Sequence, residues 1–381
     1  MKRSQLFLIF IFFYLAPTQA AGCSISLNND ITEPQPLILT PQGGYGNDAF
    51  FLPSSGDRIL LTDNQLVDIA CPNGNVLVAG ASLGSSTSQA STIPYHTARF
   101  TGNTCLTGYR EIEIGFIVGS RFLTIMLLCF DQARQHTLYS QFNLTKTIGG
   151  YQTGYPRPSW LQGSGFFTVS GVDSLYTRNQ QRITINRLLG LSDSSYQYIA
   201  ETSDLYLARG HLTAKADFLF GAQHRATFYL VNAAPQWQTF NGRNWNNLEQ
   251  DVRNYASRNA VDLVVYTGTH GVTTLLHSVT GAETELYLYV NGAARGIPVP
   301  RIFWKLVYDP VRKAGTVFIG VNNPYILNPS KDIICTNVCS QYSWLTWRAT
   351  DVEDGYSYCC SVADFRRTVT TFPNLEVTQL L

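Results

Sequence analysis

Two stretches in the middle of the chain decide the fold. Residues 205–218 are Leu-Tyr-Leu-Ala-Arg-Gly-His-Leu-Thr-Ala-Lys-Ala-Asp-Phe, in which an apolar strand leads directly into Arg209, Gly210 and His211. A glycine at this point lets the chain turn sharply or approach a ligand closely. We therefore expect Arg209 and His211 to be displayed at the end of a strand.

The second stretch, residues 232–253, passes from a loop into a helix. It is Asn-Ala-Ala-Pro-Gln-Trp-Gln-Thr-Phe-Asn-Gly-Arg-Asn-Trp-Asn-Asn-Leu-Glu-Gln-Asp-Val-Arg. A helix between residues 244 and 258 is predicted because apolar residues recur there at spacings of three and four: Trp245, Leu248, Val252 and Tyr255. On such a helix Glu249 and Arg253 lie one turn apart on the same face, so the carboxylate can pair with the guanidinium.

Together the two stretches offer the groups that phosphodiester hydrolysis needs. A neutral histidine such as His211 can take a proton from water, since its ordinary pKa is roughly 6.5. The amide oxygen of Asn241 and the carboxylate of Glu249 form a hard-oxygen environment suited to hydrated Mg²⁺. Taken singly, the three residues have commoner explanations as a surface histidine, a turn or helix cap, and half of a solvated ion pair. Their combination in this order favours a catalytic site over these separate explanations.

The first twenty residues have the layout of a cleaved signal peptide. Lys2 and Arg3 precede an apolar run over residues 6–15, which is followed by Pro17 and the small-residue stretch 18–21. A membrane span needs roughly 20 apolar residues, so this run is too short for one. We expect a secreted protein in which cleavage leaves 25 basic and 26 acidic residues, a net charge of −1.

The composition is that of a globular chain with a nearly neutral net charge. Of its 381 residues, 45% are hydrophobic and 14% are charged, which excludes a disordered chain and suggests about two domains. The formal charge of +1 argues against a polycationic protein. Residues 21–150 hold six basic and nine acidic residues, whereas residues 175–260 hold nine basic and six acidic ones. The basic excess coincides with the two stretches quoted above.

Turn-forming residues divide the chain into two predicted domains. Residues 21–150 contain short β-forming runs between breakers, at residues 58–62, 75–79 and 111–118. Residues 149–165 are rich in Gly and Pro, and we place the domain boundary there. The second domain, residues 151–381, combines the helix with strands predicted over residues 262–267, 285–290, 302–308 and 316–321. This domain is predicted to be α+β.

Eight cysteines are expected to form disulfides in an oxidising compartment. Four lie before residue 130 and four after residue 334, so the simplest arrangement pairs each group within itself and leaves the pairing inside each group open. A zinc site is the alternative for the second group, but its adjacent cysteines, Cys359 and Cys360, are poor tetrahedral ligands. The sequon Asn143-Leu144-Thr145 predicts N-glycosylation at the surface.

In order, separation and strand-then-helix context, the two stretches resemble the DNA/RNA non-specific endonucleases of the ββα-metal class. The family signature is Asp-Arg-Gly-His, then Asn-x-x-Pro-Gln, a second Asn and Trp-x-x-Leu-Glu, and residues 208–249 match it after its first position. The resemblance covers residues 151–381, and Phe303-Trp304-Lys305 is similar to a later strand of the family. The chain is most similar to the secreted arthropod branch described as double-stranded ribonucleases, which also has a signal peptide and an extra β-rich domain.

The resemblance implies an α+β fold, in which a mixed or antiparallel sheet carries a metal-site helix behind a small all-β domain. It implies that His211 is the general base, that Asn241 is the sole direct protein ligand of one Mg²⁺ or Mn²⁺, and that Glu249 holds the metal's water. Arg209 is implied to support the phosphate or the transition state. Three further matches are implied to shape the site: Asn232, Gln236 and Arg253.

Two positions leave the family pattern incomplete. The family has another arginine upstream of Arg209, for which we prefer Arg178 to Arg182. Ala208 stands where the signature has Asp, and the missing carboxylate is expected to alter metal affinity or substrate preference. The implied activity is hydrolysis of double-stranded RNA and DNA with little sequence specificity, leaving 5′-phosphates. The alternative is a catalytically weak, nuclease-like protein that binds nucleic acid.

Overall fold

The computed structural model describes residues 23–31, 36–41, 43, 46–62, 65–70, 76–79, 86–89 and 96–381, with the backbone alone for 76–79 and 86–89. The predicted signal peptide, residues 1–20, lies outside the described residues. Among the described residues, no helix is long and apolar enough to cross a membrane.

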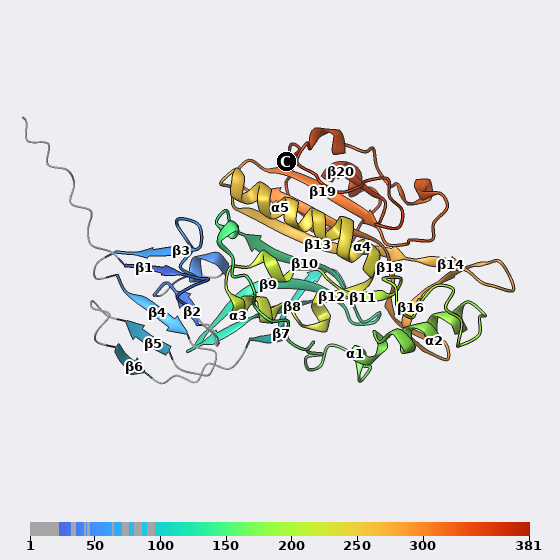
Figure 1. The fold of residues 1–381 in the computed structure, drawn as a ribbon, viewed down its shortest axis with the longest axis horizontal. Helices are drawn as coiled ribbons and strands as arrows, with labels where there is room; N and C mark the ends of the chain where they lie inside the picture. The colour runs from blue at the N-terminus through green and yellow to red at the C-terminus, as the bar shows by residue number, and fades with distance from the viewer. Residues whose placement is uncertain are drawn as a thin grey trace, which may run out of the picture.

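An antiparallel sheet of eight strands forms the centre of the molecule, in the order β20-β19-β18-β13-β10-β9-β8-β7 (Figure 1). The strands are β7 (Thr97–Leu106), β8 (Tyr109–Val118), β9 (Arg121–Asp131), β10 (His136–Leu144), β13 (Leu263–Val272), β18 (Pro300–Asp309), β19 (Ala314–Val321) and β20 (Ser357–Ser361). The predicted α+β class with an antiparallel sheet is therefore confirmed.

This sheet contradicts the domain boundary predicted at residues 149–165. Strands β7 to β10 precede that segment, but β10 pairs directly with β13, with Phe142 opposite Val265. A boundary there would cut one continuous hydrogen-bonded sheet into two. The breaker-rich composition was the only signal for the boundary, and such segments also occur inside a domain as ordered loops.

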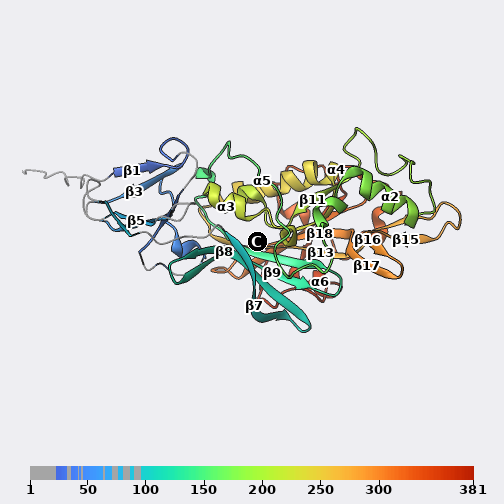
Figure 2. The same cartoon turned by 90° about the horizontal axis from the view of Figure 1, so that it is seen from below.

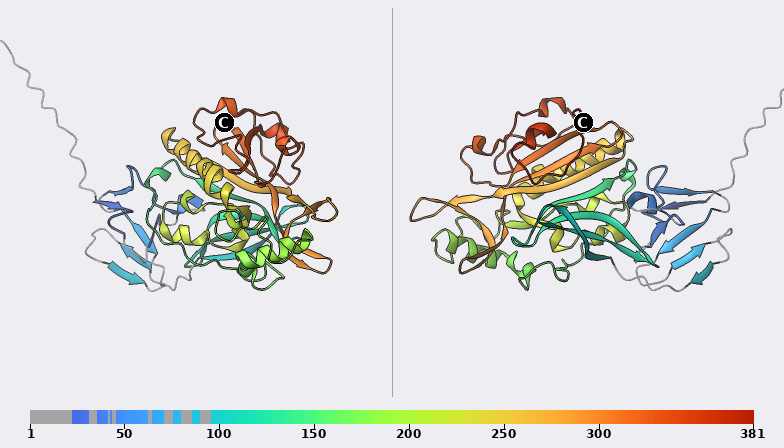
Figure 3. Two further views of the ribbon diagram at one scale, coloured as in Figure 1. Left: turned by 45° about the vertical axis from the view of Figure 1, so that its right-hand side comes forward. Right: turned by 180° about the vertical axis from the view of Figure 1, so that it is seen from behind.

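Six short strands at one end of the molecule form the β-rich part that precedes the sheet (Figure 3). They are β1 (Cys23–Ser26), β2 (Leu37–Leu39), β3 (Arg58–Leu61), β4 (Val67–Ala70), β5 (Val76–Ala79) and β6 (Ser86–Gln89), together with the 3-10 helix η1 (Gly46–Ala49). Phe50 packs on Phe220 at 5.8 Å, and buried residues from both parts share one hydrophobic core. This part has no core of its own among the described residues.

Helices and the loop that carries Trp344 cover one face of the sheet, and the segment after β20 covers the other (Figure 2). On the first face, Leu248 and Val252 of α5 (Asn246–Arg258) share a core with Phe303 of β18. On the second, Trp304 packs on Phe365 of α6 (Val362–Phe365) at 5.6 Å. Successive side chains of a strand alternate between faces, so β18 serves both cores.

The remaining elements flank these layers. The strands are β11 (Leu207–His211), β12 (Ala233–Trp237), β14 (Thr274–Leu276), β15 (Glu283–Glu285), β16 (Tyr287–Asn291) and β17 (Ala294–Pro298). The helices are α1 (Val172–Leu175), α2 (Arg178–Leu188), α3 (Gly221–Ala226) and α4 (Gln238–Phe240), with 3-10 turns η2 (Ile148–Gly150), η3 (Lys215–Asp217), η4 (Leu230–Asn232), η6 (Pro329–Asp332) and η7 (Cys339–Gln341) and the π-helical turn η5 (Asn241–Trp245).

Three disulfides connect the described cysteines, each within its predicted group. They are Cys105–Cys129, Cys335–Cys360 and Cys339–Cys359. The pairing of the last four cysteines excludes the zinc alternative, because a disulfide sulfur is no longer a thiolate ligand. Cys23 forms no disulfide with a described residue, and Cys71 lies outside the described residues.

Candidate active site

A two-stranded ribbon, β11 with β12, carries most of the site. Ala208 lies opposite Gln236 in its register, and His211 lies opposite Ala233. Gly210 packs directly on Gln236, where an added Cβ would stand 2.2 Å from the side-chain oxygen. The glycine is therefore needed for a close approach, as predicted, but the group that approaches is a side chain of the neighbouring strand.

His211 is buried at the end of β11 against two aromatic rings. Its imidazole lies 4.6 Å from the ring of Trp160 and 4.9 Å from that of Phe228, and its side chain is 7% exposed. Burial, assisted by the positive charges of Arg157 and Lys215, lowers the pKa of His211 to about 3. The imidazole is therefore neutral at physiological pH, as a general base must be.

A hydrogen bond identifies which nitrogen of His211 can accept a proton. Thr227 donates its single hydroxyl proton to the carbonyl oxygen of His224 at 2.8 Å. Its oxygen lies 3.4 Å from Nε2 of His211, so this weak bond is donated by Nε2–H. Nδ1 is then the nitrogen without a proton and the candidate base.

Asn232 holds the two segments that surround His211. Its amide oxygen accepts from the backbone N–H of Thr213 at 3.0 Å, and its nitrogen donates to the carbonyl oxygens of Thr213 and Thr227 at 2.9 Å each. The side chain is fully buried, and both of its polar atoms are bonded. Asn232 therefore fixes Thr227 relative to the end of β11.

The helical stretch begins as expected, but with a wider first turn. Asn241 opens the π-helical turn η5, which continues into α5, and such turns often occur at functional sites. The amide nitrogen of Asn241 donates to the side-chain oxygen of Gln238 at 3.0 Å. This bond orients the amide and leaves its oxygen as the acceptor. The side chain is partly exposed, so the oxygen can receive a ligand.

Arg253 does not pair with Glu249, and that prediction is wrong. Its Nη1 instead donates to Asp217 at 2.9 Å, in an ion pair whose side chains are 7% and 5% exposed. Asp217 comes from η3, 36 residues earlier, so its pairing could not be read from helical spacing. Arg253 thus ties α5 to the segment that follows His211.

Glu249 is largely surrounded by protein atoms but is partly exposed to solvent, in a region that holds several charged groups. Burial is the main cause that raises its pKa to about 7; the carboxylate of Asp217 adds to the effect, and the charges of Lys305, Arg253 and Arg157 oppose it. Lys305 is itself buried, donates to Thr267 at 2.6 Å and lies 5.4 Å from the ring of Trp245. Glu249 accepts no hydrogen bond from a described residue, so its carboxylate is available for a cation or water.

Arg157 is the arginine that the sequence reasoning missed. Its positive charge acts on both His211 and Glu249. Its guanidinium lies 5.6 Å from the ring of Phe228, and the residue is exposed. It belongs to the breaker-rich segment 149–165, which has no periodic pattern, and no signal in the sequence marks it as a site residue.

The two arginines chosen from the sequence lie elsewhere. Arg178 donates to the carbonyl oxygens of Ala200 and Ser203 at 3.1 and 2.6 Å. Arg182 donates to Asn179 at 2.7 Å. Among the described residues, neither arginine contacts His211, Asn241 or Glu249.

Arg209 is directed towards α1. It pairs with the carboxylate of Asp173 at 2.7 Å, and its guanidinium lies 5.2 Å from the ring of Tyr176. Since its side chain is 24% exposed, the pair can be reached by a phosphate. The structure therefore places Arg209 in the middle of β11, already neutralised by an acidic partner.

The residues fit a metal that keeps most of its own water. Within the described residues, no group of three or more His, Cys, Asp or Glu side chains could hold an ion. The side-chain oxygens that could bind such a metal or its waters are those of Asn241 and Glu249. Gln236 is fully buried, and neither atom of its amide bonds to a described residue. Since an unpaired buried amide is costly, Gln236 fits a site that receives a polar or charged group.

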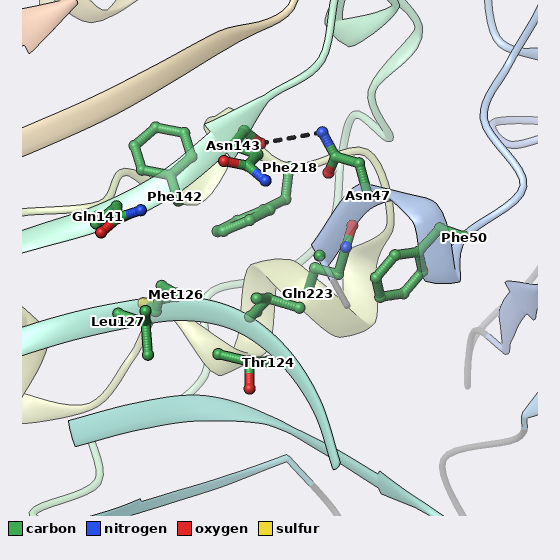
Figure 4. Close-up of a pocket in the computed structure, with 12 residues that line it drawn as sticks. Asn47, Phe50, Thr124, Met126, Leu127, Gln141, Phe142, Asn143, Phe218 and Gln223 are labelled. Atoms are coloured by element: carbon green, nitrogen blue, oxygen red, sulfur yellow. Dashed lines mark hydrogen bonds between the residues drawn. The ribbon is translucent and has the colours of Figure 1, made fainter. Parts of the chain in front are cut away.

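A separate cavity of about 270 Å³ lies between η1, β9, β10 and the loop before α3 (Figure 4). Its lining includes Phe50, Phe142, Phe218 and Asn143, the acceptor of the predicted sequon. The side-chain nitrogen of Asn47 donates to the carbonyl oxygen of Asn143 at 3.4 Å. The lining contains none of the residues assigned to the candidate site.

The chain belongs to the DNA/RNA non-specific endonuclease family, whose model matches residues 113–365. A salivary endonuclease of Lutzomyia longipalpis is 29% identical over 362 residues, which cover 90% of this chain and 82% of that protein. Salivary protein Tsal1 of Glossina morsitans morsitans is 26% identical over a match that covers 67% of this chain and 62% of Tsal1. Salivary protein Tsal2A of the same organism is 23% identical over a match that covers 92% of this chain and 92% of Tsal2A. A chain from the EndoG/EndoGI complex matches at 21% identity and a TM-score of 0.34, over 53% of this chain and 74% of that one.

The family defines the chain as a nuclease of a class that uses a divalent metal. The matched range begins within β8, so it includes strands that precede the predicted domain boundary. It contains His211, Asn241 and Glu249.

Removing the charge of Glu249 is expected to stabilise the metal-free fold. The folded pKa of Glu249, about 7, lies above its ordinary 4.5, so the folded state loses stability as pH rises from about 4.5 through 7. In chelator, Glu249→Gln should therefore have a higher Tm than wild type at pH 8 and the same Tm at pH 4. Thermal unfolding measures this, with the exposed Glu201→Gln as control. A lower Tm at pH 8 would show that the carboxylate is stabilising.

Proposed function

We propose that the chain is a secreted, Mg²⁺-dependent endonuclease that hydrolyses double-stranded RNA and DNA with little sequence specificity. The observation that carries the proposal is the neutral imidazole of His211, held at a strand end beside the positive charge of Arg157. A base and a phosphate-binding cation thus meet at one place. The relatives named for saliva support secretion.

In the proposed reaction, Nδ1 of His211 takes a proton from water while the water oxygen attacks phosphorus. The new bond joins oxygen to phosphorus, and the bond from phosphorus to the 3′ oxygen breaks. The leaving 3′ oxygen takes a proton from solvent water, and His211 returns its proton to solvent, so the products carry a 3′ hydroxyl and a 5′-phosphate. Arg157 and Arg209 bind the non-bridging oxygens, where negative charge builds up in the transition state. Because Arg209 is already paired with Asp173, Arg157 supplies the larger net charge.

Asn241 would hold the metal directly, and Glu249 would support it from the helix. When bound, Mg²⁺ supplies positive charge for the leaving oxygen. The aspartate of the signature is Ala208 in this chain, so only one carboxylate, Glu249, is proposed at the metal. We therefore propose a metal affinity lower than that of relatives that keep both carboxylates.

The proposed substrate range follows from contacts with phosphate. Groups that contact phosphate and leave base edges untouched carry no sequence information. The nine basic and six acidic residues of the segment 175–260 provide only a small cationic surface. Binding should therefore be modest and should weaken with salt. Asn143 is exposed and is the proposed acceptor of an N-glycan, which enzymatic deglycosylation of the secreted protein can reveal.

Asn241→Ala tests the proposed metal ligand. We expect cleavage at 1 mM Mg²⁺, a concentration chosen for the assay, to fall by about 10²-fold, because the metal loses its direct protein ligand. Raising Mg²⁺ or Mn²⁺ should recover part of the rate. The control is Asn246→Ala, an exposed amide on the same helix. Equal metal dependence in the Asn241 variant and in wild type would remove Asn241 from the metal site.

A further inference from the structure

The breaker-rich segment forms an ordered strap over His211. Its residue Trp160 lies 4.6 Å from the imidazole and 5.0 Å from the ring of Phe228, and Phe228 lies 4.9 Å from the imidazole. The three rings therefore contact one another pairwise. Trp160 itself is partly exposed, whereas His211, in contact with its indole, is only 7% exposed.

The strap, residues 155–161, is fixed at both ends. At one end, the ammonium of Lys215 donates to the carbonyl oxygen of Tyr155. At the other, Leu161 donates its N–H to the carbonyl oxygen of Phe228 at 2.9 Å and accepts from the N–H of Leu230 at 2.8 Å. This short parallel bridge holds the strap beside the segment that follows α3. Trp160 is thus presented by an anchored backbone.

We propose that Trp160 is a positioning residue for His211: its indole holds the imidazole in one orientation against Phe228 and shields it from bulk water. The inference rests on the proposed function, in which His211 is the general base. It extends that function by adding a residue that acts on the reaction through another side chain. The strap also carries Arg157, so one segment would supply both the shield and a phosphate-binding charge.

The charges around His211 determine how loss of the Trp160 indole should change the pKa of His211. The charged groups that act on it are Arg157 from the strap and Lys215 from η3, and both are positive. Desolvation is the larger cause of its low pKa. Opening the site to water should therefore raise the pKa of His211 from about 3 towards its ordinary 6.5. The neutral fraction at pH 6 should fall accordingly.

Trp160→Ala and Trp160→Phe test the inference in the full chain. For the alanine variant we expect kcat at pH 7 to fall by about 10-fold with little change in KM, since a freely rotating base is less often in position. The acid limb of its pH–rate profile should move to higher pH. Trp160→Phe keeps a ring against the imidazole and should retain most of the activity and the wild-type profile.

A titration by NMR adds a readout that does not depend on activity. The chain has six histidines, and His211→Ala identifies the resonance of interest. The pKa of His211 should rise in Trp160→Ala but not in Trp344→Ala, whose indole packs on Phe318 and Tyr255 and not on the imidazole. An unchanged His211 pKa and profile in Trp160→Ala, with an active wild type, would overturn this inference alone. A wild type without cleavage activity would overturn the proposed function with it.

Discussion

His211→Ala is expected to lower the rate of phosphodiester cleavage by about 10²–10⁴-fold, the usual contribution of a general base. The variant loses the one imidazole at the end of β11 and keeps Arg157 and Asn241, so substrate and metal should still bind. We therefore expect the loss in kcat, with KM nearly unchanged. The residual rate reflects electrostatic stabilisation of the phosphate.

The same variant offers a sharper test of the role. The substitution should leave a cavity where the imidazole packed against Trp160 and Phe228, so added imidazole should restore part of the rate. The control is His277→Ala, since His277 follows β14 and accepts from the N–H groups of Val279 and Thr280, away from β11. Full activity in His211→Ala would eliminate His211 as the base.

Asp217→Asn is expected to destabilise the protein by about 3–5 kcal/mol, the largest effect on folding that the site predicts. The substitution keeps the shape of the side chain but leaves the guanidinium of Arg253 buried without its counter-ion. The nearby ammonium of Lys305 is buried too, so two positive charges would then share this region with the carboxylate of Glu249 alone. Urea unfolding should show a lower midpoint at an unchanged m-value.

Two further variants separate this effect from a general loss of charge. Asp193→Asn removes the carboxylate of an exposed pair with Arg187 and should leave the urea midpoint unchanged. Arg253→Met in the Asp217→Asn background removes the stranded cation and should recover much of the lost stability. If Asp217→Asn unfolds at the wild-type midpoint, the pair does not hold α5 to η3.

The parts of the site that could be predicted from sequence are those with a local pattern. The apolar run before Arg209 leads into β11, which also includes Arg209, Gly210 and His211, and the stripe that includes Leu248 and Val252 forms α5 as expected. In both cases the residues that define the element are neighbours along the chain. Neither the strand nor the helix needs knowledge of the tertiary fold to be predicted.

The parts that could not be predicted depend on contacts between distant segments. Asp217 reaches Arg253 across 36 residues, and the competing Glu249 was closer in sequence. Arg157 and Trp160 lie near His211 because Leu161 pairs with Tyr229 in a β-bridge. A stretch rich in Gly and Pro contains no pattern that predicts such a bridge. The same absence of pattern made this segment resemble a linker between domains, although the sheet continues on both sides of it.

The proposed Mg²⁺-dependent nuclease activity is tested most directly by a cleavage assay with the purified wild-type protein. The substrates are long double-stranded RNA and plasmid DNA, first with Mg²⁺ and then with excess chelator. We expect both substrates to be cut at many positions with Mg²⁺, to yield fragments with 5′-phosphates, and to stay intact in chelator. Binding of both nucleic acids without cleavage at any Mg²⁺ or Mn²⁺ concentration would contradict the claim and would favour a nuclease-like binding protein.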